Sequence, residues 1–320
     1  MGPFLHVGNA MRIRATVAAV SGALALSAFA VPVAQAADSG AAADIAKVQE
    51  AVKAAAGKSP MSSSVAADDT DLPYTLDASF SKVTVNKGKT IAVGTRAKVT
   101  VPVTFTLTHA EDVDITAADF YTGVDLYRGT SYDEADWWLS PQDTAKCTAT
   151  STTVATCTES VVISPADDLY NEDAGKWKAA GFAIALNGVD LSDENADITK
   201  VGYVEADGFT APNIVRVAQL TVNAAPEPVK KGKTITVTGK LKRANWDTGT
   251  FAGYKGASVK LQFKKKGSST YTTLKTITSG TYGALKTTTK ATADGTYRFS
   301  YAGSTYTQAI NSSGDAVDVK

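Results

Sequence analysis

Asp294-Gly-Thr-Tyr-Arg-Phe-Ser-Tyr301 is the stretch of this sequence that best indicates its fold. Tyr297, Phe299 and Tyr301 alternate with polar residues, so all three aromatic side chains lie on one face of an extended strand. The Asp-Gly pair directly before them favours a turn. The stretch therefore predicts a strand that follows a tight turn and buries an aromatic face.

The same alternation recurs through the C-terminal part of the chain. It predicts seven strands, at Thr234–Lys242, Ser258–Lys264, Thr270–Thr278, Leu285–Ala291, Thr296–Tyr301, Tyr306–Asn311 and Ala316–Val319. Apolar residues at every second position are the pattern of a half-buried strand. Seven short strands within residues 226–320 are the proportions of an immunoglobulin-like β-sandwich.

Residues 72–225 also show short strand-like runs broken by Gly, Asp, Asn and Pro, without a long helical pattern. The order of turn residues and aromatic ring at 294–297 recurs before Trp177, which predicts a strand from Trp177 to Leu186. The next predicted strand is Ile214–Val222, which leaves residues 187–213 as a long insertion. The fold class is therefore all-β, with two immunoglobulin-like β-sandwich domains in tandem.

The predicted domain boundary lies at Asn223-Ala-Ala-Pro-Glu-Pro-Val229, where two prolines interrupt the strand pattern. Residues 37–225 contain 14 Lys and Arg against 27 Asp and Glu, whereas residues 226–320 contain 16 against 5. The equal totals of 32 basic and 32 acidic residues thus hide an acidic domain followed by a basic one. Val85–Ile91 and Val229–Ile235 are nearly the same heptapeptide, which favours two related units.

Residues 1–36 have the pattern of a secretory signal peptide. A basic segment that starts at Met11, the favoured start, precedes an Ala-rich apolar run, and Ala34 and Ala36 form a small-residue cleavage site. This run is short and weakly apolar for a permanent anchor, and no later run is long enough to span a bilayer. We expect a secreted protein, extracellular or loosely associated with the cell envelope, without a membrane span in its mature form.

Residues 37–71 are rich in Ala, Ser and Asp, and we expect a flexible segment there. Ile45, Val48, Val52 and Ala55 recur at helical spacing. They predict one short amphipathic helix within that segment.

Cys147 and Cys157 flank a Thr-rich run with high β-propensity, which predicts a hairpin that turns near Thr152. Facing residues of antiparallel strands have Cβ atoms about 4.5 to 5.5 Å apart, close enough for a bridge after slight adjustment. Because disulfides persist in secreted proteins, we predict a structural disulfide between Cys147 and Cys157. A redox-active pair would have a shorter spacing such as Cys-x-x-Cys.

The basic domain resembles the secreted immunoglobulin-like proteins of actinobacteria. The resemblance rests on Lys231–Leu241, Arg243–Trp246, Tyr254–Phe263 and Asp294–Arg298. It covers residues 226–320 well and 72–225 loosely. It implies a β-sandwich, with a tyrosine corner at Tyr297, and export, but no settled activity. Some proteins of this type are labelled calcium-binding.

Catalytic motifs are missing from the sequence. It contains no Gly-x-Ser-x-Gly, His-Glu-x-x-His, P-loop or Gly-x-Gly-x-x-Gly motif, and its two histidines are His6 and His109. We therefore expect no enzyme activity and no cofactor other than a possible calcium ion. An extracellular protein is not expected to meet nucleic acid as a natural partner.

Asp190, Asp193, Glu194 and Asp197 crowd one predicted loop and are the candidate calcium ligands. Hard oxygen ligands suit calcium, which takes about 6 to 8 of them. The spacing does not match the Asp-x-Asp-x-Asp-Gly calcium loop, so an ordinary solvated acidic loop is the alternative.

Two basic groups in the second domain are candidates for binding polyanions. They are Lys264, Lys265 and Lys266, and Lys240, Lys242 and Arg243. Such charges attract anionic wall polymers. The alternative is that they protect exposed sheet edges against aggregation.

Trp137 and Trp138 are neighbours on a predicted strand and therefore face opposite sides. We expect Trp138 in the core and Trp137 over a loop; a sugar-stacking role for one ring is the alternative.

Taken together, the sequence predicts a secreted, non-enzymatic protein with an extracellular binding or structural role. Its partner would be an anionic cell-wall polymer or an extracellular protein. The alternative is a calcium- or glycan-binding accessory module.

Overall fold

The computed structural model describes residues 44–45, 47–50, 52, 72–193 and 195–320. The predicted signal peptide, the start at Met11 and most of the predicted flexible segment lie outside these residues. The chain forms two compact units. The first contains the described residues up to Lys89, Thr100–Ile163 and Trp177–Pro212, and the second contains Thr90–Val99, Ser164–Lys176 and Asn213–Lys320.

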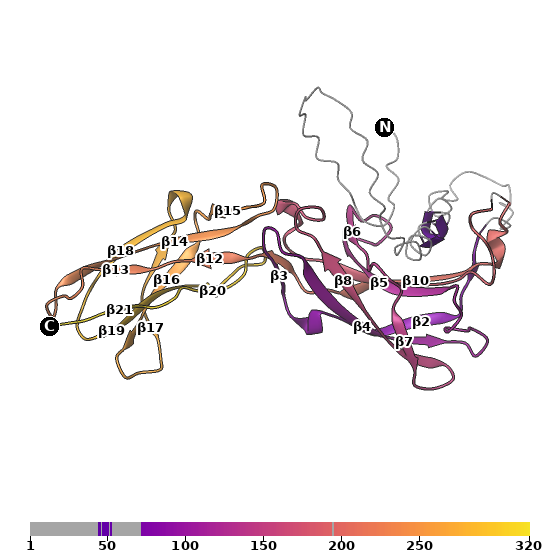
Figure 1. Ribbon diagram of the computed structural model, residues 1–320, viewed down its shortest axis with the longest axis horizontal. Helices are drawn as coiled ribbons and strands as arrows, with labels where there is room; N and C mark the ends of the chain where they lie inside the picture. Colours follow the sequence, from indigo (N-terminus) through magenta and orange to yellow (C-terminus); the bar gives the residue numbers. More distant parts are fainter. Residues whose placement is uncertain (1–43, 46, 51, 53–71, 194) are drawn as a thin grey trace, which may run out of the picture. The chain divides into compact units, whose positions relative to one another are not determined.

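The first unit is a sandwich of two sheets (Figure 1). One sheet has the strand order β1-β10-β9-β5-β6, with β1 at Tyr74–Thr75, β10 at Gly202–Thr210, β9 at Lys178–Ala185, β5 at Phe120–Arg128 and β6 at Trp137–Leu139. The other has the order β2-β4-β8-β7, with β2 at Ala78–Val85, β4 at Val99–His109, β8 at Val154–Ile163 and β7 at Lys146–Ala149.

The core of the first unit lies between these sheets. In β4 the buried Val101, Val103, Phe105 and Leu107 alternate with exposed or half-buried Thr and Pro residues, as the period of a strand requires. On β9, Gly181 has no side chain because a Cβ there would lie 2.6 Å from the Phe80 ring. The two sheets therefore approach closely at this point.

A helix formed by residues 44–45, 47–50 and 52 covers the outer face of the larger sheet. Val48 is fully buried against Phe182 and Ile184 of β9 and Tyr203 of β10. The predicted amphipathic helix is confirmed for its described residues. The central strands β9 and β5 of this sheet are buried on both faces.

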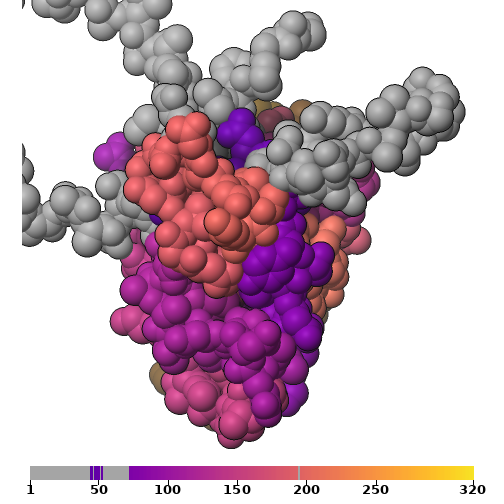
Figure 2. Space-filling view, turned by 90° about the vertical axis from the view of Figure 1, so that its right-hand side faces the viewer, coloured from indigo at the N-terminus to yellow at the C-terminus, as the bar shows by residue number. Residues whose placement is uncertain are grey.

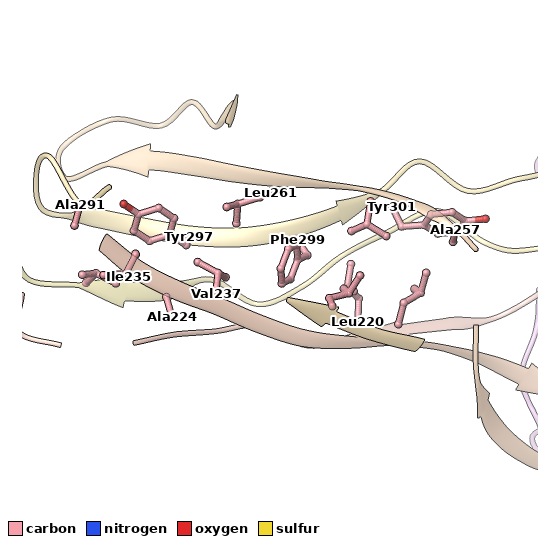
Figure 3. Packing of buried hydrophobic residues seen from close by; sticks show 14 of the residues in the cluster. Leu220, Ala224, Ile235, Val237, Ala257, Leu261, Ala291, Tyr297, Phe299 and Tyr301 are labelled. Atoms are coloured by element: carbon pink, nitrogen blue, oxygen red, sulfur yellow. The ribbon is translucent and has the colours of Figure 1, made fainter. Parts of the chain in front are cut away.

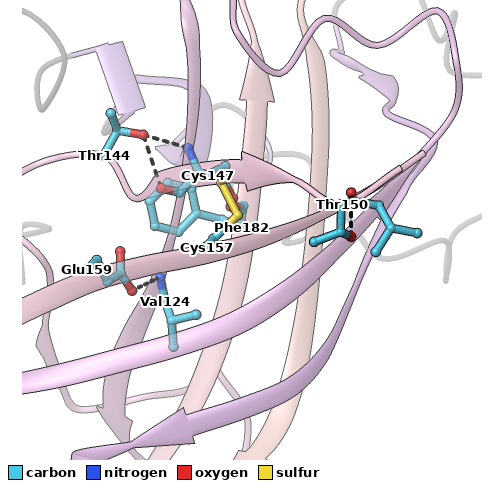
Figure 4. The surroundings of a disulfide bond; sticks show 9 residues. Val124, Thr144, Cys147, Thr150, Cys157, Glu159 and Phe182 are labelled. Carbon is cyan, nitrogen blue, oxygen red and sulfur yellow. Dashed lines mark hydrogen bonds between the residues drawn. A yellow bond between two sulfur atoms is a disulfide. The ribbon is translucent and has the colours of Figure 1, made fainter. Parts of the chain in front are cut away.

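The disulfide prediction is confirmed (Figure 4). Cys147 of β7 lies directly opposite Cys157 of β8, with 4.0 Å between their Cα atoms. The hairpin turns between Thr150 and Val154, where two backbone N–H groups donate to the Val154 carbonyl.

The last strand of the first unit is β10, and the prediction of Ile214–Val222 for this role was wrong. β10 pairs antiparallel with β9, inside the segment predicted to be an insertion. A bulge between Ala206 and Phe209, with Gly208 at a φ of 83°, breaks the alternation that marks a strand. Residues of the predicted strand instead form β11 (Ile214–Arg216) and β12 (Ala218–Leu220) in the second unit.

The second unit is a sandwich too (Figure 1). In one sheet β12, β13 (Asn223–Ala225), β15 (Thr250–Gly253) and β18 (Ala284–Lys290) all pair with β14 (Thr234–Asn245). The other has the order β17-β16-β19-β20, with β21 also paired to β19; these strands are β17 (Thr272–Thr278), β16 (Ser258–Lys265), β19 (Gly295–Tyr301), β20 (Ile310–Asn311) and β21 (Asp315–Val317). A parallel pair joins β11 to β3 (Ile91–Val93).

Six of the strands predicted for residues 226–320 exist with slightly shifted ends, and the predicted strand Tyr306–Asn311 is reduced to Ile310–Asn311. The strand β15 at Thr250–Gly253 was not predicted. The inward side chains of these strands, among them Val237, Leu261, Tyr297 and Phe299, fill the core between the two sheets (Figure 3). The prediction of an all-β chain with two immunoglobulin-like sandwiches is confirmed. Among the described residues, no helix is long and apolar enough to cross a membrane.

The second unit is larger than residues 226–320. Trp246, which is fully buried, donates from Nε1 to the carbonyl of Gly94 at 2.8 Å. The side chain of Asn171 donates to Asn245 Oδ1 at 2.8 Å. Two earlier segments of the chain, Thr90–Val99 and Ser164–Lys176, thus complete the fold of the C-terminal unit.

Candidate functional site

The outer face of the β14 sheet in the second unit is the candidate functional site. On β14, buried Ile235, Val237 and Leu241 alternate with Lys240 and Lys242, whose side chains therefore point away from the core. Lys240 is exposed and Lys242 is half-buried.

The neighbouring strand β18 adds two more lysines to this face. Lys286 pairs with Thr238 and Lys290 pairs with Thr234, and both lysines are exposed. Threonines occupy most of the remaining outward positions, at Thr234, Thr236, Thr238 and Thr288. Along the described strands β12, β13, β14 and β18, no outward position carries Asp or Glu. We call Lys240, Lys242, Lys286 and Lys290 the basic face.

The other predicted basic residues lie elsewhere. Lys264 and Lys265 are in β16 of the opposite sheet and Lys266 follows it, so they do not join Lys240 and Lys242 in one patch. Lys266 forms a salt bridge of 3.6 Å with Asp294. The guanidinium of Arg243 lies 4.0 Å from the centre of the Tyr254 ring. The sequence could not show that the two basic groups lie on different sheets, because the sheet assignment depends on which strands pair.

The predicted calcium ligands lie on the loop between β9 and β10, which is salmon at the surface in Figure 2. Each described Asp there binds its own loop: Asp190 accepts from the backbone N of Ser192 at 2.8 Å, and Asp193 from that of Asn195 at 2.9 Å. Hydrogen bonds from the Ser192 hydroxyl and then from the Ser192 backbone N lower the pKa of Asp190. Asp197 caps a short 3-10 helix, and Glu194 lies outside the described residues.

Among the described residues, no group of three or more His, Cys, Asp or Glu is placed to hold a metal ion. Because Glu194 is not among them, the four predicted ligands cannot be compared as a set. Calcium binding at this loop stays a prediction.

A buried cluster of carboxyl groups and tyrosines on the first unit was not predicted. Asp125 of β5 is only 2% exposed and accepts from the Tyr132 hydroxyl. Gln49 of the N-terminal helix donates to the same hydroxyl at 3.3 Å. Burial raises the pKa of Asp125. The sequence gives no sign of this cluster, because its members come from distant segments.

The cluster continues along the sheet. Tyr127 donates to Asp207, which also accepts from the backbone N of Tyr132 at 2.9 Å, and Tyr203 donates to Glu205 at 2.7 Å. Tyr127 is fully buried. Asp207 itself is exposed, and its bonds to Tyr127 and to the backbone N of Tyr132 hold the loop before β6 on the sheet.

Glu159 is a second inward carboxyl group, beside the disulfide (Figure 4). Its Oε1 accepts from the backbone N of Val124 at 2.8 Å, while Oε2 is buried and has no hydrogen-bond partner among the described residues. Burial raises the pKa of Glu159 to about 9. No nucleophile or imidazole adjoins this carboxyl in the contacts of the described chain, which gives it no evident catalytic role.

The two neighbouring tryptophans exchange their predicted places. Trp137 is 4% exposed, while Trp138 is half-buried and meets the Tyr132 ring edge-on at 6.3 Å. The alternation was right and the choice of face was wrong, because the outer face of this sheet is itself covered.

His109 is buried at the end of β4, with Nδ1 2.9 Å from the Ala110 carbonyl oxygen.

A hollow of about 410 Å³ lies in the second unit, near β3 and β11. Its polar lining comes from Thr90, Ser304, Thr307 and Gln308, and its other lining residues are apolar or glycine. None of its lining residues is titratable.

Comparisons with known proteins give no family for this chain. No protein-family model matches it, and no curated protein matches its sequence. Solved structures with a similar arrangement include the adhesin InvE of Yersinia pseudotuberculosis, at 13% identity and a TM-score of 0.23, covering 75% of this chain and 60% of the adhesin chain.

Two fragments of titin are similar as well. The I-band fragment I67–I69 has 11% identity and a TM-score of 0.28. The match covers 76% of this chain and 65% of the titin fragment. Domains A168–A170 have 8% identity and a TM-score of 0.23. The match covers 76% of this chain and 66% of the titin fragment. This chain thus spans about two thirds or less of each of these structures, and likenesses this distant assign no activity to it.

Proposed function

We propose that this chain is a secreted, non-enzymatic protein with an extracellular binding or structural role, and that its basic face attracts anionic polymers of the cell envelope. The observation that carries the proposal is the basic face itself: Lys240, Lys242, Lys286 and Lys290 on one sheet surface without an outward carboxylate on the described strands. Clustered charge of one sign attracts a polyanion.

Three further features support export. The predicted signal peptide and the resemblance to secreted actinobacterial immunoglobulin-like proteins both imply it. The disulfide between Cys147 and Cys157 fits an oxidising compartment.

The test is retention of the chain from residue 37 onward on isolated bacterial cell envelope at low and high salt. We expect retention at low salt that falls steeply with salt, because exposed charges are screened within about 10 Å at roughly 0.1 M. The triple variant K240A/K242A/K286A should lose retention. A variant with equal charge change on the opposite sheet, K260A/K264A/K265A, should keep it. Equal retention of the unsubstituted chain, the triple variant and the control variant would contradict the proposal.

A calcium- or glycan-binding accessory module is the second candidate, favoured by the acidic loop at 187–197. Calcium at about 100 times its dissociation constant should stabilise the fold by about 2.7 kcal/mol. The D190N/D193N variant would remove that gain if the loop binds the ion. A melting temperature that does not change with calcium rejects the calcium-binding form of this candidate.

A further inference from the structure

Tyr282 has an unusual backbone and an unusually exposed ring. It lies in the left-handed region, at φ 57° and ψ 23°, in the short turn Thr281–Gly283 before β18. Its side chain is 80% exposed, the highest value among the large hydrophobic residues that the structure describes. A bulky residue in this region is a genuine outlier, and such strain persists only where the surroundings enforce it.

The surroundings of the turn enforce this conformation. A Cβ at Gly283 would lie 1.9 Å from the Leu241 carbonyl oxygen, and a Cβ at Gly253 would lie 2.1 Å from the Tyr282 carbonyl carbon. Gly280 donates its backbone N–H to Ala284 at 2.8 Å, and Gly283 donates to Gly280 at 3.1 Å. The backbone of the turn is therefore tightly packed, and it carries an exposed ring.

The turn stands on the basic face. Gly253 pairs with Lys242 and therefore shares its outward side, and the Tyr282 backbone occupies the space where a Gly253 side chain would be. Ala284, two residues after Tyr282, pairs with Lys240. An exposed aromatic ring thus stands beside the positions of two outward lysines.

We propose that Tyr282, Lys240 and Lys242 form a binding site for an acidic polysaccharide, in which a sugar ring stacks on Tyr282 and its anionic group pairs with the lysines. This inference rests on the proposed function and deepens it by naming the ligand class. Charge complementarity favours an anion on this face, and an exposed aromatic ring adds a contact that a bare anion does not use.

The test compares two polyanions, polygalacturonate, which has sugar rings, and polyphosphate, which has none. The chain from residue 37 onward is used throughout. We expect Y282A to weaken polygalacturonate binding about fivefold to tenfold, as for one lost aromatic contact, and to leave polyphosphate binding unchanged. Y282F keeps the ring and should bind both as the parent does. K240A/K242A should weaken both.

Controls separate a local effect from a general one. Y306A removes another exposed tyrosine of the same unit, and K260A/K265A removes two lysines of the opposite sheet; neither should alter binding. Thermal unfolding of each variant checks its fold.

Three outcomes would overturn the inference. If Y282A changes neither affinity while K240A/K242A lowers both, the sugar site is wrong and the proposed function stands. If Y282A lowers both affinities equally, the ring does not contact sugar selectively. If K240A/K242A changes neither affinity, both the site and the electrostatic part of the proposed function are wrong.

Discussion

Glu159 shows at the scale of one residue how burial controls a charge. Its carboxyl lies between the sheets, with one oxygen bonded to the Val124 backbone and the other unpartnered among the described residues. Burial favours the neutral acid, and the pKa rises from 4.5 to about 9. The Glu159 carboxyl is therefore protonated in the folded protein at neutral pH.

This protonation makes stability depend on pH. Below about pH 4.5 the group is neutral in both states, and between about 4.5 and 9 only the unfolded state loses the proton, so stability falls as pH rises. We predict that Glu159→Gln stabilises the protein at pH 8 by about 1 to 3 kcal/mol and by little at pH 4.5. Urea unfolding at both pH values measures this. A matched change at the exposed Glu111→Gln should have no such dependence, and an equal effect at both pH values would refute the pKa argument.

Gly283 is a second residue with a definite requirement. It has a φ of 75°, and a Cβ would overlap the Leu241 carbonyl oxygen at 1.9 Å. We predict that Gly283→Ala costs more than about 2 kcal/mol of unfolding free energy, because it adds a clash with backbone to the strain of a positive φ. Thermal unfolding tests it.

Gly256→Ala is the matched control for this change. Gly256 has a φ of 82° with nothing within 4 Å of its would-be Cβ, so only the strain, about 1 kcal/mol, applies. Equal costs for the two variants would show that the turn before β18 is free to move.

At the scale of elements, the N-terminal helix depends on the sheet that it covers. Helices shorter than about 12 residues are marginal in water, and Val48 is fully buried against β9 and β10. We predict that Val48→Asp detaches the helix, because an unpaired charge cannot be buried there, and costs about 2 to 4 kcal/mol.

Limited proteolysis and hydrogen exchange across residues 44–52 measure the detachment. Glu50→Gln, at an exposed position of the same helix, is the control and should not alter protection. Unchanged protection in Val48→Asp would mean that the helix is held by other contacts, such as the bond of 2.5 Å from Lys47 Nζ to the Leu191 carbonyl.

At the scale of the whole molecule, the C-terminal unit needs residues that precede the predicted boundary. β12 and β13, which end at Ala225, both pair with β14 and bury Leu220 and Ala224 in its core. A fragment that begins at 226 leaves one edge of β14 unpaired and part of the core uncovered.

We therefore predict that residues 213–320 unfold at a clearly higher temperature than residues 226–320. Burial of two apolar side chains and two strand pairings contributes a few kcal/mol, which corresponds to about 10 °C or more for a unit of this size. Thermal unfolding of the two fragments decides it. Equal melting temperatures would show that the fold does not need β12 and β13.

Several features could be predicted from the sequence because they depend on neighbours in the chain. Alternation at Tyr297, Phe299 and Tyr301 indicates a strand wherever the strand is placed, and the Thr-rich run between Cys147 and Cys157 indicates a hairpin. The helical spacing of Ile45, Val48 and Val52 is local as well.

Only the tertiary structure decided what these elements contact. The bulge in β10 hid its period, the covered outer sheet face exchanged the places of Trp137 and Trp138, and Trp246 bonds to Gly94, 152 residues earlier in the chain. The basic face and the Tyr282 turn likewise exist only once β18 and β15 pair with β14. The physical reason is that side-chain period is a local property of the backbone, whereas strand pairing and burial join residues that are far apart in the sequence.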